Sequence, residues 1–130
     1  MTLPLDGYDG NDFYCDVALP NISALDVVYD GEGVLAFHHT RPFWPVHIVV
    51  VPKRHVPSLT DPQGADDALV RELLTVVQEV ARAVEAAHGA ARVLTNLGTY
   101  QDSKHLHVHV STGDELSRPG ASVGTRSKSR

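Results

Sequence analysis

The sequence predicts an α+β domain in which an antiparallel sheet is covered on one face by a single long helix. Three features of the sequence predict this class. Runs of β-branched residues, separated by turn residues, fill the first half of the chain. One long segment then repeats its apolar residues at helical spacing, and a short alternating segment follows it. Hairpins combined with one long crossover are typical of an α+β domain.

Short apolar runs predict the strands. LDVVYD (25–30) and VLAFHH (34–39) flank the turn-like DGEG and together predict a hairpin. VHIVVVP (46–52) is the strongest strand signal, because β-branched residues fill it and a proline closes it. RVLTNLG (92–98) and HLHVHV (105–110) are expected to be the last two strands.

The segment from about Ala65 to His88 is predicted to be an amphipathic helix that ends at Gly89, since glycine favours the left-handed conformation that closes a helix. The residues of its apolar stripe recur at steps of three and four: Leu69, Leu73, Val76, Val77, Val80 and Val84. This stripe should meet the apolar face of the last strand in the core. The opposite face of that strand is then expected to line a cleft or to meet solvent.

Length and composition predict one globular domain, since the chain has 130 residues and 42% of them are hydrophobic. We expect a flexible segment over residues 1–12, the domain over 13–116 and a disordered basic tail over 117–130. The formal net charge of -5 argues against a nucleic-acid polymer as partner. No bilayer-spanning stretch and no secretory signal are visible, so a cytoplasmic protein that binds no membrane is the expectation.

The HLHVHV segment places three histidines at every second position. In an extended strand His105, His107 and His109 share one face, and the aliphatic residues between them share the other. This pattern has three interpretations: a solvated polar face, a metal site or a nucleophilic site. Neutral imidazole binds zinc, but adjacent histidines of the three are about 7 Å apart along a strand and the outer two about 13 Å. Another ligand would have to come from His38, His39, His47 or His55.

Nucleophilic catalysis is the third interpretation. Neutral imidazole attacks phosphorus well near neutral pH, and flanking histidines can bind phosphoryl oxygens or assist the leaving group. The attacking ring needs its other nitrogen hydrogen-bonded to a carbonyl or carboxylate, which selects the correct tautomer. Because a protonated ring has no free electron pair, the rate is expected to fall below about pH 6.

The histidines belong to a longer pattern that resembles the histidine triad (HIT) family. HLHVHVS (105–111) resembles the family signature His-x-His-x-His-x-x, in which x is apolar. PVHIVVVPKRHV (45–56) resembles its central strand motif, VVYDGEGVLAF (27–37) its opening hairpin, and NLG (96–98) its Asn-x-Gly. The resemblance extends from about residue 13 to residue 115.

The resemblance implies a five-stranded antiparallel sheet with one long helix, usually paired into a homodimer with a continuous sheet. It implies a hydrolase or nucleotidyltransferase that acts at the α-phosphate of a nucleotide derivative, such as a phosphoramidate or a dinucleoside polyphosphate. No metal and no other cofactor is required for this chemistry. The competing interpretations are a metal-dependent enzyme that uses the three histidines and a non-catalytic, nucleotide-binding dimer.

The resemblance also implies roles for single residues. His107 matches the nucleophile that becomes nucleotidylated, and His109 matches the residue that contacts the phosphoryl oxygens. His105 matches the residue whose backbone carbonyl holds the nucleophile's tautomer, and His47 matches a fourth family histidine near the site. The candidates for substrate binding are Asn96, Gln101, His39 and Ser103.

The sequence departs from the family pattern at several positions. His39 stands where the family often has an acidic residue for the ribose hydroxyls, and neutral imidazole accepts only one hydrogen bond. Asp102 stands where a Ser or Thr is usual, next to Ser103, and Ser111 replaces the last apolar residue of the signature. Many members hold a structural zinc through an N-terminal Cys-x-x-Cys; FYCDVAL keeps only Cys15, so we expect this zinc to be absent.

Overall fold

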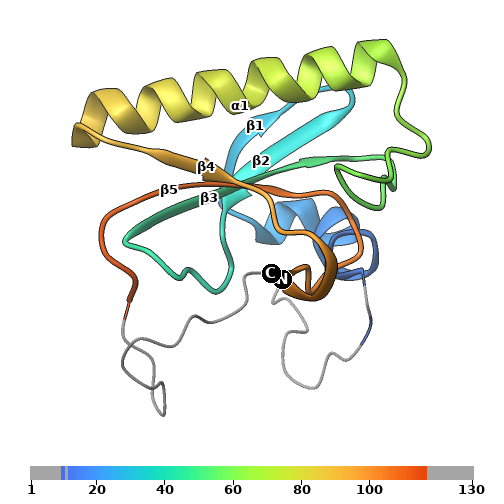
Figure 1. Ribbon diagram of the computed structural model, residues 1–130, viewed down its shortest axis with the longest axis horizontal. Helices are drawn as coiled ribbons and strands as arrows, with labels where there is room; N and C mark the ends of the chain where they lie inside the picture. The colour runs from blue at the N-terminus through green and yellow to red at the C-terminus, as the bar shows by residue number, and fades with distance from the viewer. Residues whose placement is uncertain (1–9, 11, 117–130) are drawn as a thin grey trace.

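The computed structural model of the protein describes residues 10 and 12–116; the predicted basic tail and most of the predicted N-terminal segment lie outside the described residues. Five strands form one antiparallel sheet in the order β1-β2-β3-β5-β4. The long helix α1 covers one face of the sheet, and short helical segments near the N-terminus lie against the other (Figure 1). The predicted α+β class with five antiparallel strands is therefore confirmed.

Each predicted strand is present, but several ends differ. The strands are β1 (Val27–Asp30), β2 (Val34–His38), β3 (Val46–Pro52), β4 (Arg92–Leu94) and β5 (Val108–Thr112). The prediction that the last strand begins at His105 was wrong, because β5 begins at Val108. Side chains bind the backbone ahead of it: the His107 ring lies 2.7 Å from the His105 carbonyl oxygen, and Thr95 donates to the His107 carbonyl at 2.8 Å. The pairing of β5 with β3 accordingly ends at Val108, and these side-chain contacts hold the backbone before it.

Helix α1 (Asp67–His88) forms where the sequence predicted it. The Asp66 carboxylate caps its first turn by accepting from the Leu69 N–H at 2.8 Å, and Gly89 closes it with φ of 83°. All six residues of the predicted stripe reach the cluster between helix and sheet, with Val34, Ala36, Ile48, Val50, Val108 and Val110 opposite them. None of the described helices is long and apolar enough to cross a membrane.

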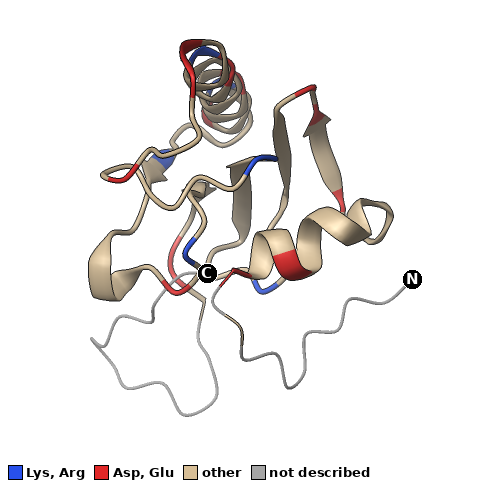
Figure 2. Ribbon diagram, turned by 90° about the vertical axis from the view of Figure 1, so that its right-hand side faces the viewer, with Lys and Arg blue, Asp and Glu red and all other residues tan. Residues whose placement is uncertain are grey.

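The face of the sheet opposite α1 is also covered, which the sequence did not predict. Two short helical segments, η1 (Tyr14–Ala18) and η2 (Leu19–Ala24), lie on this face, as the side view of Figure 2 shows. A third, η3 (Gly98–Tyr100), follows β4. The residues of η1 pack with buried residues of β2 and β3 into a second core cluster: Phe13, Tyr14, Val17, Ala18, Leu35, Phe37, Val49 and Val51.

Two sequence expectations need correction here. Leu106 was expected to face α1; it is buried, but its N–H donates to the Val56 carbonyl at 2.6 Å, and it is not part of the helix cluster. Asp12 was expected in the flexible segment, but it is only 7% exposed and accepts a hydrogen bond from the Cys15 N–H. The ordered chain therefore includes at least one residue before the predicted boundary.

Candidate active site

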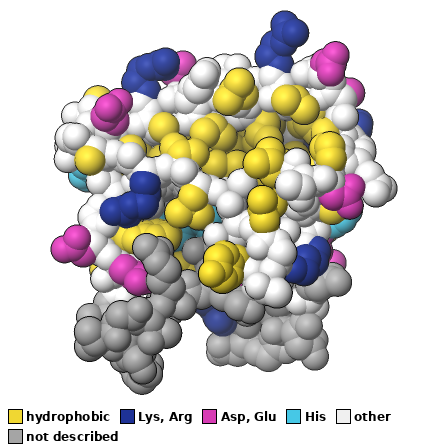
Figure 3. Space-filling model, viewed as in Figure 1, with side chains coloured by type: hydrophobic (Ala, Val, Ile, Leu, Met, Phe, Trp, Pro, Cys, Tyr) yellow, Lys and Arg dark blue, Asp and Glu magenta, His cyan; other side chains and the backbone are white. Residues whose placement is uncertain are grey.

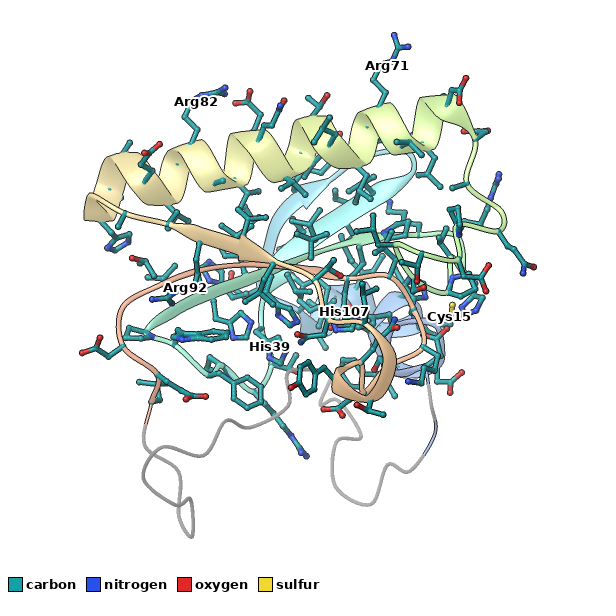
Figure 4. The ribbon with its side chains drawn as sticks, in the orientation of Figure 1. Cys15, His39, Arg71, Arg82, Arg92 and His107 are labelled. Carbon is teal, nitrogen blue, oxygen red and sulfur yellow. The ribbon has the colours of Figure 1, made fainter. Side chains whose placement is uncertain are left out.

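The three histidines of the HLHVHV segment are fully buried on the sheet face opposite α1. His105, His107 and His109 are 0%, 1% and 0% exposed. Strand pairing of His109 with Val49 places the site on the side of the second core cluster, and Figure 4 shows His107 there, below the sheet. The Tyr14 ring covers it, with its centroid 4.9 Å from that of His107. The expectation of an open histidine face was therefore wrong.

His107 has a defined tautomer. Its Nδ1 lies 2.7 Å from the His105 carbonyl oxygen, which can only accept, so Nδ1 carries the proton and Nε2 keeps its electron pair. The pKa of His107 is lowered to about 4, mainly by burial; nearby His39 and His105 act in the same direction, and the hydrogen bond to the carbonyl opposes them. At neutral pH this ring is therefore unprotonated and has a free electron pair on Nε2.

His109 carries its proton on Nε2, the nitrogen that is unprotonated in His107. The Phe43 N–H donates to Nδ1 of His47 at 3.0 Å, so His47 carries its proton on Nε2. That N–H donates to Nδ1 of His109 at 2.7 Å, which leaves the proton of His109 on Nε2. Burial, followed by the nearby His107, holds the pKa of His109 well below its usual range. His109 is thus a neutral ring with an N–H donor.

These two nitrogens lack a partner. Among the described residues, Nε2 of His107 and Nε2 of His109 are the buried side-chain nitrogen or oxygen atoms without a hydrogen bond. The two rings meet edge to face with their centroids 4.9 Å apart. Buried polar atoms without partners cost stability, on the order of 1–3 kcal/mol each, and are uncommon in proteins. A free electron pair beside a free N–H can accommodate a group that is both electrophilic and rich in acceptor oxygens.

Of the residues predicted to bind substrate, His39 lies beside this pair, with its ring centroid 5.8 Å from that of His109. His39 is buried, and its Nδ1 accepts from the Arg41 N–H at 3.0 Å. When neutral, the His39 ring therefore carries its proton on Nε2 and offers no acceptor to a sugar hydroxyl. Asn96 is half-buried and follows Thr95, whose hydroxyl holds the His107 carbonyl. The sequence interpretation missed Thr95, because the family pattern marks only its neighbour.

Gln101 and Ser103 support the backbone near the site. The Gln101 amide donates to the Pro57 carbonyl at 2.8 Å, and both side chains are buried. The Ser103 hydroxyl accepts from the Phe13 N–H at 3.4 Å, which ties the loop to the N-terminal segment. The contacts described for these two side chains are therefore with the protein backbone.

A second cluster of polar residues lies on the other side of His105. Asp12, Cys15, His55 and His105 each direct one potential ligand atom into a group whose members all lie within 4.8 Å of one another. His105 points Nε2 at the Pro52 carbonyl oxygen (2.8 Å) and Nδ1 at a carboxylate oxygen of Asp12 (3.2 Å) and at Sγ of Cys15 (3.3 Å). The Pro52 carbonyl can only accept, so in the neutral ring Nε2 carries the proton and Nδ1 offers its electron pair to the Cys15 thiol or to a metal ion.

The donor set of this cluster fits a divalent metal. Two imidazoles, a carboxylate and a thiolate are ligands of the kind that tetrahedral zinc takes in proteins. Burial, followed by Asp12, raises the pKa of the Cys15 thiol to about 11, and a bound metal would supply the positive charge that favours the thiolate. The prediction that zinc is absent counted cysteines alone and did not consider Asp12, three positions before Cys15.

One ion held by all three triad histidines is contradicted by the geometry. Two groups of potential ligands occur among residues 10 and 12–116, and His107 belongs to neither of them. His105 belongs to the cluster with Asp12, whereas His109 belongs to a group with His39 and His47. In that second group, His47 and His109 are already joined by a direct hydrogen bond of 2.7 Å, which leaves no space for an ion between them.

A buried, neutral, tautomer-fixed histidine beside a second imidazole, on a five-stranded antiparallel sheet with one covering helix, defines a domain of the histidine triad class. The family model described as HIT domain matches residues 23–116, and the chain belongs to the HIT family. An uncharacterised HIT-like protein of Azospirillum brasilense is 36% identical over 112 residues, which cover 84% of this chain and 91% of that protein. Protein HitA of Neisseria gonorrhoeae is 32% identical, covering 77% of this chain and 94% of its own length.

Solved structures agree with this assignment. A HIT family hydrolase from Legionella pneumophila Philadelphia 1 superimposes with a TM-score of 0.66 at 26% identity, covering 85% of this chain and all of that one (100%). A histidine triad protein from Clostridium difficile has a TM-score of 0.66 at 30% identity, covering 86% of this chain and 98% of its own.

Proposed function

We propose that the protein is a hydrolase or nucleotidyltransferase in which Nε2 of His107 attacks the α-phosphate of a nucleotide derivative. The observation that carries this proposal is the unpartnered electron pair of a buried, neutral His107 beside the N–H of His109. The relative from Legionella pneumophila is named a hydrolase, which supports an enzymatic role. The family resemblance supplies the substrate class, a phosphoramidate, a dinucleoside polyphosphate or a related conjugate.

The reaction has two steps in this proposal. Nε2 of His107 forms a bond to phosphorus as the bond to the leaving group breaks, and the leaving group departs with its electron pair and takes a proton from solvent. The N–H of His109 donates to a phosphoryl oxygen as negative charge develops on it. Water or another acceptor then forms a bond to phosphorus and loses a proton to solvent, while the P–N bond breaks and its electron pair returns to Nε2 of His107.

The substrate class can be tested with purified protein and a panel of adenosine and guanosine 5′-phosphoramidates, dinucleoside polyphosphates and sugar phosphates. The expected product is a nucleoside monophosphate from the nucleotide substrates, with no turnover of sugar phosphates. Turnover of sugar phosphates alone would contradict the proposed class. Because His39 presents a donor, we expect weaker discrimination between ribose and deoxyribose than a carboxylate at this position would give.

We further propose that Asp12, Cys15, His55 and His105 hold a divalent metal ion such as Zn²⁺. When bound, this ion would neutralise the negative charge of Asp12 and of the Cys15 thiolate beside Nδ1 of His105. It would also link the N-terminal segment to His105, whose carbonyl orients His107. It would supply structural rather than reactive chemistry, because neither His107 nor His109 belongs to this cluster.

Metal binding should raise thermal stability. Zn²⁺ added to metal-free protein is expected to raise the melting temperature by several degrees, since a ligand that binds only the folded state stabilises it. With Co²⁺, a thiolate-to-metal charge-transfer band should appear. Asp12→Ala should weaken both effects and Asp12→Cys should keep them, whereas Asp114→Ala, at an exposed acidic residue, serves as the control. An Asp12→Ala variant with unchanged zinc affinity would contradict the assignment.

We also propose that the protein is a homodimer that pairs through α1 and β4. Strand β4 is an edge strand, and Val93 on it is 49% exposed. Val70 and Leu74 of α1 are 52% and 57% exposed, and Figure 3 shows hydrophobic side chains gathered between the helix and this edge. Light scattering should give twice the chain mass, and Val93→Lys should lower it toward that of the monomer. A monomeric wild type would refute this pairing.

A further inference from the structure

His47 fixes the proton of His109, and its own ring is held on two sides. The His39 ring stacks on it with centroids 4.3 Å apart at 20°, and the Trp44 ring meets it at 4.8 Å and 70°. Trp44 is only 8% exposed. A ring enclosed in this way cannot turn without displacing its neighbours. Trp44 therefore helps to determine in which direction His47 points its N–H.

Trp44 is covered in turn by Arg92 of β4. The Arg92 guanidinium carbon lies 5.4 Å from the centroid of the Trp44 ring, which is within the range of a cation–π contact. Its two terminal nitrogens donate to Ser111 Oγ at 3.2 Å and to the Gly113 carbonyl at 2.8 Å. A guanidinium fixed at both ends of its fork has little freedom to leave the ring.

The register of the sheet explains why these groups meet. His47 pairs with Ser111 across β3 and β5, and Arg92 pairs with Ser111 across β4 and β5, so the three residues form a row on one sheet face. Figure 4 shows Arg92 and His39 on the same side of the sheet as His107. Ser111 is fully buried at 0% exposure, and an apolar side chain there could not accept the hydrogen bond from Arg92. The hydrogen bond from Arg92 thus gives a structural reason for a serine at position 111, where the family signature has an apolar residue.

We propose that Arg92 and Trp44 are positioning residues for the catalytic pair. Ser111 and Gly113 hold Arg92, Arg92 holds Trp44, and Trp44 holds the His47 ring so that His109 keeps its proton on Nε2. Neither Arg92 nor Trp44 touches the reacting atoms in this account. The effect on rate rests on the proposed function, whereas the effect on the His109 tautomer does not.

The tautomers are measured directly by ¹⁵N NMR of histidine-labelled full-length protein without substrate. The wild type should show His47 and His109 as Nε2–H tautomers. Trp44→Leu should give mixed tautomers at both residues, because the His47 ring can turn, while Trp44→Phe should largely restore the pattern. Arg92→Met should give a smaller change in the same direction, and Arg92→Lys should fall between it and the wild type. Arg71→Met, on the far side of α1, is the matched control (Figure 4).

Kinetics with the best nucleotide substrate gives the second readout. Trp44→Leu should lower kcat by about 10-fold or more with KM within about twofold, because a donor misplaced in the transition state affects turnover rather than binding. Mixed tautomers accompanied by lower kcat support the proposal. Unchanged tautomers in both Trp44→Leu and Arg92→Met would overturn it, and so would altered tautomers with an unchanged kcat. An inactive wild type would refute the proposed function, and the tautomer measurement would still decide the positioning role.

Discussion

His107→Asn is expected to lower turnover by several orders of magnitude while leaving the fold intact, as loss of a covalent nucleophile does. The asparagine amide N–H can still donate to the His105 carbonyl, which His107 contacts at 2.7 Å through Nδ1. It has no electron pair of comparable basicity in the position of Nε2. Steady-state assays of wild type and variant on the same nucleotide substrate measure the difference.

The fold of the variant needs its own control, because His107 is 1% exposed and lies between Tyr14 and His109. Circular dichroism and the melting temperature should match those of the wild type within a few degrees. His107→Ala removes more volume and is expected to be less stable but equally inactive. If the correctly folded asparagine variant kept more than about a tenth of wild-type turnover, His107 would not be the nucleophile.

The second prediction concerns pH: kcat/KM should fall only at a lower pH than the ordinary pKa of histidine would give. Protonation of His107 removes the attacking electron pair, and burial lowers its pKa from 6.5 to about 4. A lowered pKa moves the loss of activity to lower pH, so kcat/KM should stay level from pH 7 to about pH 5 and fall near pH 4. The expectation from the sequence alone placed this fall below about pH 6. At pH 5, a ring with a pKa of about 4 and a ring with the ordinary pKa of 6.5 differ by about 30-fold in the fraction that is neutral.

Acid unfolding could mimic this loss of rate, and the same pKa predicts it. A histidine that is neutral when buried and has its ordinary pKa when unfolded contributes stability that is present above about pH 6.5 and is lost as the pH falls toward 4. Rates should therefore be measured in short assays after dilution from pH 7, with the fold followed by fluorescence. A profile that falls with an apparent pKa near 6.5 in folded protein would show that the free His107 is solvated.

Periodicity explains why so much of the fold could be predicted. The helix stripe from Leu69 to Val84 and the strand at 46–52 are long local patterns, and the structure places both where they were expected. The first residue of β5 could not be predicted in this way. It depends on Thr95 and on the ring of His107 itself, which bind backbone carbonyls that the strand pattern assigns to the ladder.

From the sequence, the motif predicted the histidines of the candidate site but not the residues that surround them. The motif singles out His107 and His109, but not their surroundings. The contact of Asp12 with His105 spans 93 positions, and the site's cover by η1 comes from a segment without a long helical pattern. Likewise Trp44 could be placed near the central strand from sequence, but its contact with Arg92 depends on the pairing of β4 with β5. Such contacts require the three-dimensional register.

A covalent intermediate on His107 is the central claim, and mass spectrometry of rapidly quenched protein tests it most directly. Wild-type protein mixed with an adenosine phosphoramidate and quenched at alkaline pH should carry one adenylyl group, which peptide mapping places on His107. The His107→Asn variant should carry none. A burst of released leaving group without an adduct, or an adduct that persists in His107→Asn, would contradict covalent catalysis by this residue.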